Sequence, residues 1–294
     1  MKPVVIALGA LTFAFALRLA AGAQTLPAAT PSPAASSAPT AAATPAPPNA
    51  IGPALFANDP CTSLNAIVTR PTVSNSVCTV RPNHVLIETG YQNTSADGGG
   101  NAVQYPQMLV RVGTQLPGLE AFIAVPTVQK ISGGGATLSG VTDIAAGLKY
   151  VLGATPKFSY GVQGQISAPT GTNAFSANGT DAIGALNLGY ALGSVFSLSS
   201  ALQIQSLYAN GTRYTSFVPS LVLAAGLPQS TSLYGEIARF SNAIGASTPT
   251  RTQYILGVSH DIGQRLQLDL EGGYSPTTVT GKYRYVGFGF SYYL

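Results

Sequence analysis

The last ten residues of the chain, 285–294, alternate strictly between two faces. A period of two indicates a β-strand. In a soluble protein an exposed apolar edge promotes aggregation, whereas the final strand of an outer-membrane barrel pairs with the first and turns its apolar face to lipid. The pattern therefore favours such a barrel over the terminal strand of a soluble sandwich. One face carries Val286, Phe288, Phe290, Tyr292 and Leu294, and the other carries Tyr285, Gly287, Gly289, Ser291 and Tyr293.

The composition also indicates a protein that crosses a membrane with strands. Only 8% of the residues are charged, against about 25% in ordinary soluble domains, and 33 are glycine. After residue 23 no apolar stretch reaches the roughly 20 residues that a membrane helix needs. Without Lys2 and Arg18 the net charge falls from +4 to +2, so nothing indicates a nucleic-acid partner. The predicted fold is an all-β, transmembrane, antiparallel up-and-down β-barrel.

The first fifty residues are expected to serve export and spacing. Residues 1–23 have a basic start, an apolar core and an Ala-Gly-Ala cleavage site, which predicts a signal peptide and a mature chain that begins at Gln24. Residues 24–50 include 17 Ala or Pro among 27 and no charge. They are expected to form a disordered, extended linker. The alternative, a tether for cell-wall material or a partner, has no binding motif to support it. The predicted location is the bacterial outer membrane.

Residues 51–83 are predicted to form a periplasmic segment that contains both cysteines of the chain, Cys61 and Cys78. In an oxidising compartment two thiols are expected to form one structural disulfide, worth about 3 kcal/mol in the chain-entropy model. A metal site would need more ligands than the nearby His84, and a redox site would favour Cys-x-x-Cys spacing. We therefore expect a bridge that holds this segment against the first strand.

Residues 84–294 divide into twelve alternating runs separated by clusters of Gly, Pro, Asn and Ser. An even number of strands, with short turns at one end and longer loops at the other, is typical of bacterial barrels. Pro219 lies on the outward face within a run and predicts a bulge. The predicted strands are 84–93, 103–113, 119–131, 140–152, 157–168, 181–193, 195–207, 214–227, 230–241, 251–262, 265–275 and 283–294.

The two faces of these runs differ in polarity. The apolar face, with residues such as Ile144 and Leu148, carries no charge and is assigned to lipid, where a charge would cost about 2–4 kcal/mol. The other face is mostly small residues and amides with scattered charges, which suits a narrow wet lumen. We expect the pairs Arg111–Glu120 and Lys149–Asp143 to set a constriction, gated by inward side chains and the amino-terminal segment. The residues predicted to line the lumen are Glu88, Arg111, Glu120, Asp143, Lys149, Gln163, Gln165, Asn187, Gln203, Gln205, Glu236, Asp269 and Glu271.

The sequence offers little that could catalyse a reaction. His84 and His260, the two histidines, fall at strand ends and are expected to pack there. Asp261, Asp269 and Glu271 could gather in the lumen, where acidic groups more often pair with Arg or Lys for structure than catalyse. We therefore predict no catalytic residues, no metal site and no cofactor.

Several short motifs resemble a known family. Glu88-Thr89-Gly90-Tyr91 opens the first strand, and Gly140-Val141-Thr142-Asp143-Ile144 leads to Gly147-Leu148-Lys149-Tyr150. Ala168-Pro169-Thr170-Gly171-Thr172 ends the fifth strand. With them, residues 84–294 resemble the outer-membrane transporters linked to degradation of phenol and other aromatic compounds by the meta pathway. The resemblance implies a channel for small organic molecules and leaves the substrate unidentified.

The leading hypothesis is therefore a channel or transporter through which small molecules, with hydrophobic or aromatic ones as candidates, diffuse passively. The alternative is a structural or surface-adhesion barrel with a closed lumen, and an outer-membrane enzyme is a weaker one. The expected partners are outer-membrane lipid, a small-molecule substrate and the barrel-assembly machinery, which would recognise the C-terminal strand.

Overall fold

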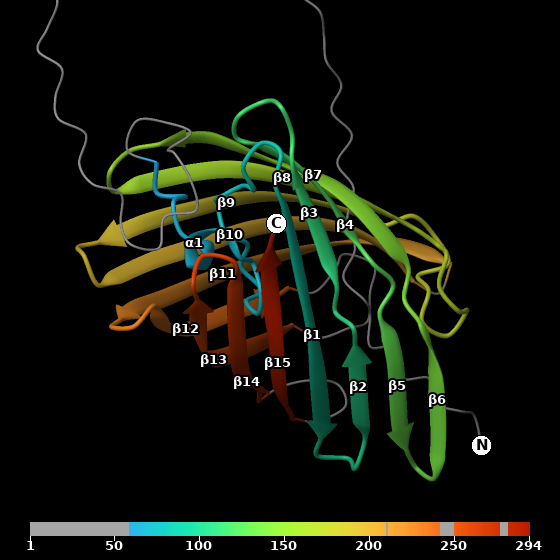
Figure 1. Ribbon diagram of the computed structural model, residues 1–294. Helices are drawn as coiled ribbons and strands as arrows, with labels where there is room; N and C mark the ends of the chain where they lie inside the picture. Colours follow the sequence, from blue (N-terminus) through green and yellow to red (C-terminus); the bar gives the residue numbers. More distant parts are fainter. Residues whose placement is uncertain (1–58, 210, 242–249, 277–281) are drawn as a thin grey trace, which may run out of the picture.

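The computed structural model describes residues 59–209, 211–241, 250–276 and 282–294. The predicted signal peptide, its cleavage before Gln24 and the linker 24–50 lie outside these residues, as do residues 51–58 of the predicted periplasmic segment. The described chain forms one closed antiparallel sheet wrapped into a barrel of twelve strands, which confirms the predicted fold class (Figure 1).

The barrel closes where its first and last strands pair, in register from Leu86 with Tyr293 to Ala96 with Tyr283. This pairing leaves no open edge at the seam, as a membrane barrel requires. The strands are β1 (Val85–Ala96), β2 (Asn101–Tyr105), β3 (Leu109–Gly113), β4 (Leu119–Ala124), β5 (Val128–Gly133), β6 (Ala136–Val141), β7 (Ile144–Ala154), β8 (Phe158–Ala168), β9 (Ala182–Leu192), β10 (Phe196–Ala209), β11 (Thr212–Leu227), β12 (Thr231–Phe240), β13 (Arg251–Ile262), β14 (Leu266–Ser275) and β15 (Tyr283–Tyr293).

Three runs that were predicted as continuous strands are each broken in two. The predicted strand 103–113 divides into β2 and β3, 119–131 into β4 and β5, and 140–152 into β6 and β7. Pro106 and Pro126 stand at the first two breaks, where a proline lacks the N–H that a strand ladder needs. The pieces β3, β4 and β7 complete the barrel beside the first half of β1, and β2, β5 and β6 extend the wall beside its second half, at the bottom of Figure 1.

The predicted bulge at Pro219 is wrong. Pro219 pairs directly with Leu202 in an unshifted β10–β11 register, and the β11–β12 ladder begins one residue later, at Ser220. Its missing N–H therefore falls just beyond the ladder with β12. The structure instead places a register shift between Val151 and Gly153, where β7 pairs with β8.

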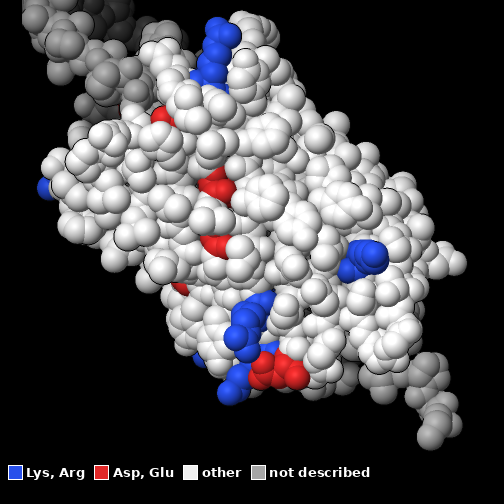
Figure 2. Space-filling view, turned by 60° about the horizontal axis from the view of Figure 1, so that its bottom comes forward, with Lys and Arg blue, Asp and Glu red and all other residues white. Residues whose placement is uncertain are grey.

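Large apolar side chains cover the outside of the barrel, as the alternation predicts. Leu148, Leu256 and Phe288 are each more than half exposed. Figure 2 shows a face of the molecule that is mostly uncharged, with a few Asp and Glu side chains near its middle and scattered Lys and Arg. Such a surface is stable only where lipid covers it. Among the described residues no helix is long and apolar enough to cross a membrane.

Residues 59–83, which we call the inner segment, lie inside the barrel (Figure 1). The segment has one short helix, α1 (Leu64–Ile67), capped by the Ser63 side chain, which accepts a hydrogen bond from Ala66 N. The predicted disulfide between Cys61 and Cys78 is present. Of the predicted periplasmic segment 51–83, the structure places residues 59–83 within the lumen, where the charged groups of the barrel find partners on them.

A small hydrophobic core holds the inner segment against the seam of the barrel. The two half-cystines pack with Leu64, Ile67, Val68 and Val80 against Leu86 of β1 and Tyr293 of β15, and all of these residues are buried. Inward residues of the first and last strands thus form part of the barrel wall and also pack directly against the inner segment.

Candidate functional site

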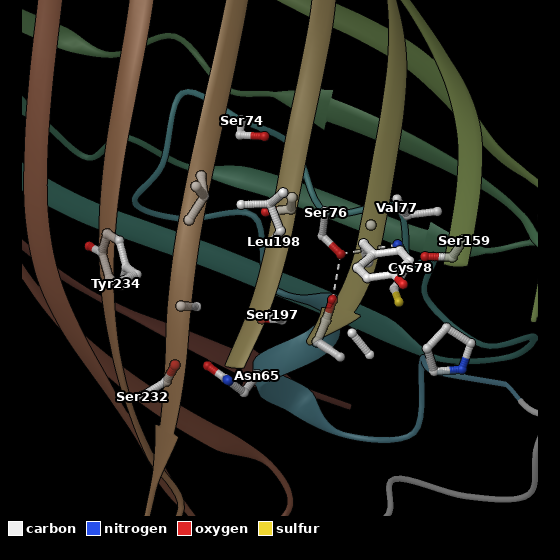
Figure 3. A pocket seen from close by; sticks show the side chains of 18 of the residues that line it. Asn65, Ser74, Ser76, Val77, Cys78, Ser159, Ser197, Leu198, Ser232 and Tyr234 are labelled. Carbon is white, nitrogen blue, oxygen red and sulfur yellow. Dashed lines mark hydrogen bonds between the residues drawn. The ribbon is translucent and has the colours of Figure 1, made fainter. Parts of the chain in front are cut away.

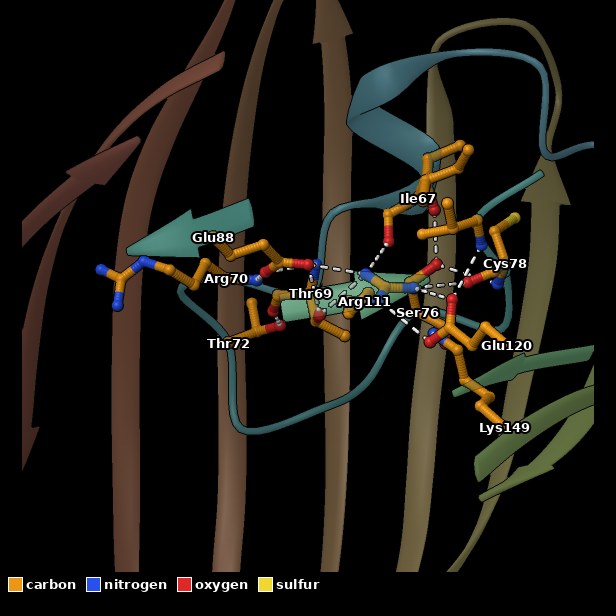
Figure 4. Close-up of polar contacts among 12 residues, drawn as sticks. Ile67, Thr69, Arg70, Thr72, Ser76, Cys78, Glu88, Arg111, Glu120 and Lys149 are labelled. Atoms are coloured by element: carbon orange, nitrogen blue, oxygen red, sulfur yellow. Dashed lines mark hydrogen bonds and ion pairs between the residues drawn. The ribbon is translucent and has the colours of Figure 1, made fainter. Parts of the chain in front are cut away.

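Arg111 is the centre of the polar contacts inside the barrel (Figure 4). Its side chain is 1% exposed. Towards the wall, its guanidinium donates two hydrogen bonds of 2.9 Å to Glu120 and one of 2.6 Å to Glu88. It also donates to two carbonyl oxygens of the inner segment, those of Ile67 at 2.7 Å and Cys78 at 3.0 Å. One side chain therefore joins three strands to the segment.

The two carboxylates around Arg111 bind the inner segment as well. Glu88 accepts the backbone N–H groups of Thr69 at 3.1 Å and Arg70 at 2.8 Å. Glu120 accepts the N–H of Val80 at 2.7 Å. Since bonds to charged groups are each worth about 1.5–3 kcal/mol, these contacts hold the segment firmly.

The predicted pair of Arg111 with Glu120 is present, and the predicted pair of Lys149 with Asp143 is wrong. Lys149 Nζ lies 3.3 Å from Glu120 Oε1 and donates to the Ser76 carbonyl at 3.1 Å. Asp143 stands at the break between β6 and β7, six residues away along the chain. Its carboxylate there accepts the N–H groups of Gly171 at 2.8 Å and Ala177 at 2.9 Å. Asp143 thus anchors the loop after β8 instead of a constriction.

Arg70 links the inner segment to residues on both sides of the seam. It donates to Gln107 Oε1 at 2.9 Å and lies 3.3 Å from Asp269 Oδ1. Its guanidinium rests on Gly90 and Gly289, which face each other across the β1–β15 pairing, and a Cβ atom at either position would collide with it. The two glycines therefore make room for the arginine, a relation that spacing along the sequence could not reveal.

Glu236 of β12 binds the middle of the inner segment. Its carboxylate accepts the N–H of Val73 at 2.8 Å and that of Ser74 at 2.6 Å. Gln203 of β10 donates to the Val73 carbonyl at 3.0 Å. The segment consequently spans the lumen from the seam to the opposite wall.

The other predicted lumen residues also lie on the inward face. Gln163 and Gln165 are half-buried on β8, and Gln205 donates to Gln203 at 3.2 Å. Glu271 accepts the Tyr285 hydroxyl at 3.3 Å. Asn187 of β9 is fully buried, and within the described part of the chain neither polar atom of its side chain has a partner.

The two histidines lie at strand ends. His84 Nδ1 is 2.8 Å from the Leu294 carbonyl, and its ring stacks on Tyr293. His260 Nδ1 is 2.9 Å from the Thr231 hydroxyl. Within the described ranges, no three His, Cys, Asp or Glu side chains are grouped so that they could hold a metal ion.

A cavity of about 310 Å³ remains beside the inner segment (Figure 3). The segment supplies one wall with residues such as Ser74, Ser76 and Val77, and the other wall comes from strands β8 to β14. Eight serines line this cavity, and its described lining contains no Asp or Glu. Its charged lining residues are Arg70 and Lys157.

A second cavity, of about 280 Å³, has a different lining. Glu88, Glu271, Gln92 and Gln107 contribute to it. Residues 70–72 of the inner segment line both cavities, so the segment divides the lumen into a serine-lined space and an acidic one.

Solved structures of other outer-membrane proteins resemble this architecture. An outer membrane channel of the COG4313 group from Pseudomonas putida F1 has a TM-score of 0.53 at 15% sequence identity, covering 74% of this chain and 97% of that chain. The KdgM porin has a TM-score of 0.46 at 13% identity, covering 70% of this chain and 98% of its own. No curated protein matches the sequence. The first likeness defines the class, a β-barrel with the fold of an outer-membrane channel.

The family follows from the sequence match. The chain belongs to the family described as "Putative MetA-pathway of phenol degradation", whose model matches residues 69–294. This confirms the resemblance drawn from the short motifs. The match begins at Thr69, inside the inner segment, and so covers more than the barrel strands alone.

Proposed function

We propose that the protein lets small molecules cross the bacterial outer membrane by passive diffusion. The observation that carries this proposal is the serine-lined cavity, which remains open beside the inner segment. Strands β8, β9 and β10, which we call the uncharged arc, contain no charged residue. A solute could pass along this wall without competing for the ion pairs that hold the segment.

We propose further that export uses the signal peptide 1–23 and that the barrel-assembly machinery recognises β15. The support is the basic and apolar pattern of the first residues and the apolar alternation of the last strand. We also propose that the protein transports solutes and catalyses no reaction. The family's description, which refers to phenol degradation, makes small aromatic compounds the first solutes to test.

A barrel with a closed lumen is the second candidate. It is favoured by the buried ion pairs around Arg111, which fix the inner segment to three strands. A segment held in this way could be a permanent filling whose purpose is to stiffen the barrel. In that case the loops or the linker would perform the function.

Conductance of the full-length protein in planar lipid bilayers separates these candidates. Uniform single-channel steps, together with entry of small uncharged solutes into liposomes, are expected of the channel. Protein that was boiled before reconstitution is the control, because it has lost its barrel. A correctly assembled wild-type barrel that neither conducts nor admits solutes would establish the closed alternative.

A further inference from the structure

The inward face of strands β12, β13 and β14 carries a run of buried carboxylates. The register of these strands places one carboxylate in each of four successive inward layers, and every one is at most 7% exposed. Among the described residues, the ion pairs of these carboxylates comprise a single contact, from Asp269 to Arg70. We call this set the acidic ladder. Its members, in order from the β13–β14 turn, are Asp261, Asp269, Glu271 and Glu236.

One basic side chain against four buried carboxylates leaves the ladder with an excess of negative charge. Neutral groups supply part of the hydrogen bonding. Gln267 donates to Asp261 at 2.7 Å, and the Tyr285 hydroxyl donates to Glu271 at 3.3 Å. Such donors leave the net charge in place, whereas buried charges are normally paired with an opposite charge. The ladder is therefore a wall that attracts cations.

Arg70 already supplies one cation to the ladder from within the protein. Figure 4 shows its side chain extending away from the other polar contacts drawn there. The guanidinium lies against Gly90 and Gly289, where a Cβ atom would collide with it. Its Nη1 donates to Gln107 Oε1 at 2.9 Å, and its Nη2 lies 3.3 Å from Asp269 Oδ1. The niche is thus shaped for a flat cationic group.

Arg70 leaves part of this niche unsatisfied. In the part of the chain that the structure describes, Asp269 Oδ2 and Arg70 Nε are both buried without a hydrogen-bond partner. The Asp269 side chain is 0% exposed, so bulk water does not reach its second oxygen. A free guanidinium group can present two parallel N–H donors to both oxygens of one carboxylate. The niche therefore offers a soluble cation more hydrogen bonds than it gives Arg70.

The niche adjoins the second cavity, of about 280 Å³. Arg70 and Glu271 both line that cavity. Glu271 follows Asp269 by two residues on β14, so the two side chains lie on the same face of the strand. A small cation that enters this cavity thus meets two carboxylates of the ladder.

We propose that the acidic ladder binds small, planar organic cations that carry a guanidinium group, and that Arg70 occupies this site in the resting barrel. A soluble guanidinium compound displaces the Arg70 side chain and pairs with Asp269 and Glu271. The inference goes beyond the proposed function, because it concerns the wall of strands β12 to β14 and does not require passage along the uncharged arc.

Calorimetric titration of ethylguanidinium into full-length protein in zwitterionic lipid nanodiscs tests the inference, with empty nanodiscs as the blank. Arg70→Ala vacates the niche, while the backbone N–H of residue 70 still bonds to Glu88, so this variant should bind the probe saturably. Wild type should bind it about tenfold more weakly, because the tethered arginine competes at a high effective concentration. Adding Asp269→Asn to Arg70→Ala should weaken binding about ten- to a hundredfold.

Two controls match the charge and the shape. Asp97→Asn, added to Arg70→Ala, removes a carboxylate whose side chain is 48% exposed and lies outside the ladder, and it should leave binding unchanged. Urea has the planar shape of guanidinium without its charge and should not bind. A mobility difference between unheated and boiled samples shows that each barrel has assembled. If Asp269→Asn prevents assembly, Glu271→Gln in the same background replaces it and should weaken binding several-fold.

Four results would overturn the inference. They are the absence of saturable binding by assembled Arg70→Ala, equal affinity in wild type, equal affinity after loss of the ladder carboxylate, and equal binding of urea. Conductance of the same preparations shows which proposal has failed. A barrel that conducts without binding the probe keeps the proposed function and loses the cation site, whereas one that binds without conducting does the reverse.

Discussion

Two sides of the lumen differ in what they do with the inner segment. On strands β1, β3, β4 and β7, which we call the charged arc, Glu88, Arg111, Glu120 and Lys149 all bind the segment directly. The uncharged arc, which follows β7 around the barrel, offers amides, hydroxyls and small side chains. Its described hydrogen bond to the segment is the one from Gln203 to Val73.

This contrast explains how a narrow barrel can be filled on one side and open on the other. Buried charges must be paired, so the charged arc draws the polar backbone of the inner segment onto itself. The uncharged arc has no buried charge that needs a partner, and its small residues leave space. A serine-lined cavity therefore lies beside an immobilised segment.

The largest expected effect comes from removing the centre of the charged arc. Arg111→Met leaves Glu88 and Glu120 buried without their main partner, which should destabilise the segment's attachment by about 3–5 kcal/mol. We expect the segment to leave its place, which would raise single-channel conductance and expose residues 59–83 to protease. Arg213→Ala at the exposed barrel end is the control and should change neither. Unchanged conductance and protease resistance in Arg111→Met would refute the role given to the charged arc.

The next effect concerns the disulfide. Replacing Cys61 and Cys78 together with Ser should loosen the inner segment by about 3 kcal/mol in the chain-entropy model. The barrel should still form, because strand pairing and lipid contact hold it without the bridge. Protease cleavage within residues 59–83 measures the first effect, and the mobility difference between unheated and boiled protein measures the second. Loss of that difference would mean that the segment is needed for the barrel itself.

A smaller effect is expected on β12, where Glu236 binds the inner segment. Glu236→Gln keeps the shape of the side chain but removes the charge that accepts the N–H groups of Val73 and Ser74, at a cost of about 1–2 kcal/mol. We expect noisier conductance with short openings, since Val73 and Ser74, the tip of the segment, can then leave β12. Gln253→Ala on the neighbouring strand β13 is the control, because the described hydrogen bonds of Gln253 go to Tyr283 and Tyr285 and not to the segment. Identical traces for the two variants would show that Glu236 does not restrain the tip.

The smallest effect on stability should come from the uncharged arc. Ser199→Leu narrows the serine-lined cavity, so solute entry into liposomes should fall several-fold while assembly stays within about 0.5 kcal/mol of wild type. Ser200→Leu places the same side chain on the outward face of the same strand and should leave entry unchanged. If both variants admit solutes as wild type does, the path does not follow the uncharged arc.

The sequence predicted most of the barrel because its signals are local. The twelve strands, their outward faces and the pairing of β1 with β15 all follow from a period of two and from turn residues. Two of the three broken strands were missed because Pro106 and Pro126 sit inside runs that otherwise alternate. The bulge at Pro219 was predicted in error because the neighbouring ladder begins one residue later than the proline.

The candidate site was only partly predictable. Alternation placed charged residues such as Arg111 and Glu120 on the inward face, and cross-strand proximity suggested their pairing. It could not show that Lys149 reaches Glu120 instead of Asp143, since that depends on which strands are neighbours and where the wall bends. The resting place of Arg70 on Gly90 and Gly289 likewise joins positions that are far apart in the chain.

Which side of each strand meets lipid and which meets the lumen can be read from the sequence alone, because it depends on a repeat of two residues. That residues 59–83 fill the charged side of the lumen and leave the uncharged side open emerges only when the barrel has closed. A buried charge can be satisfied by any polar group that reaches it. The groups that reach these charges belong to a segment whose position follows from closing the whole barrel.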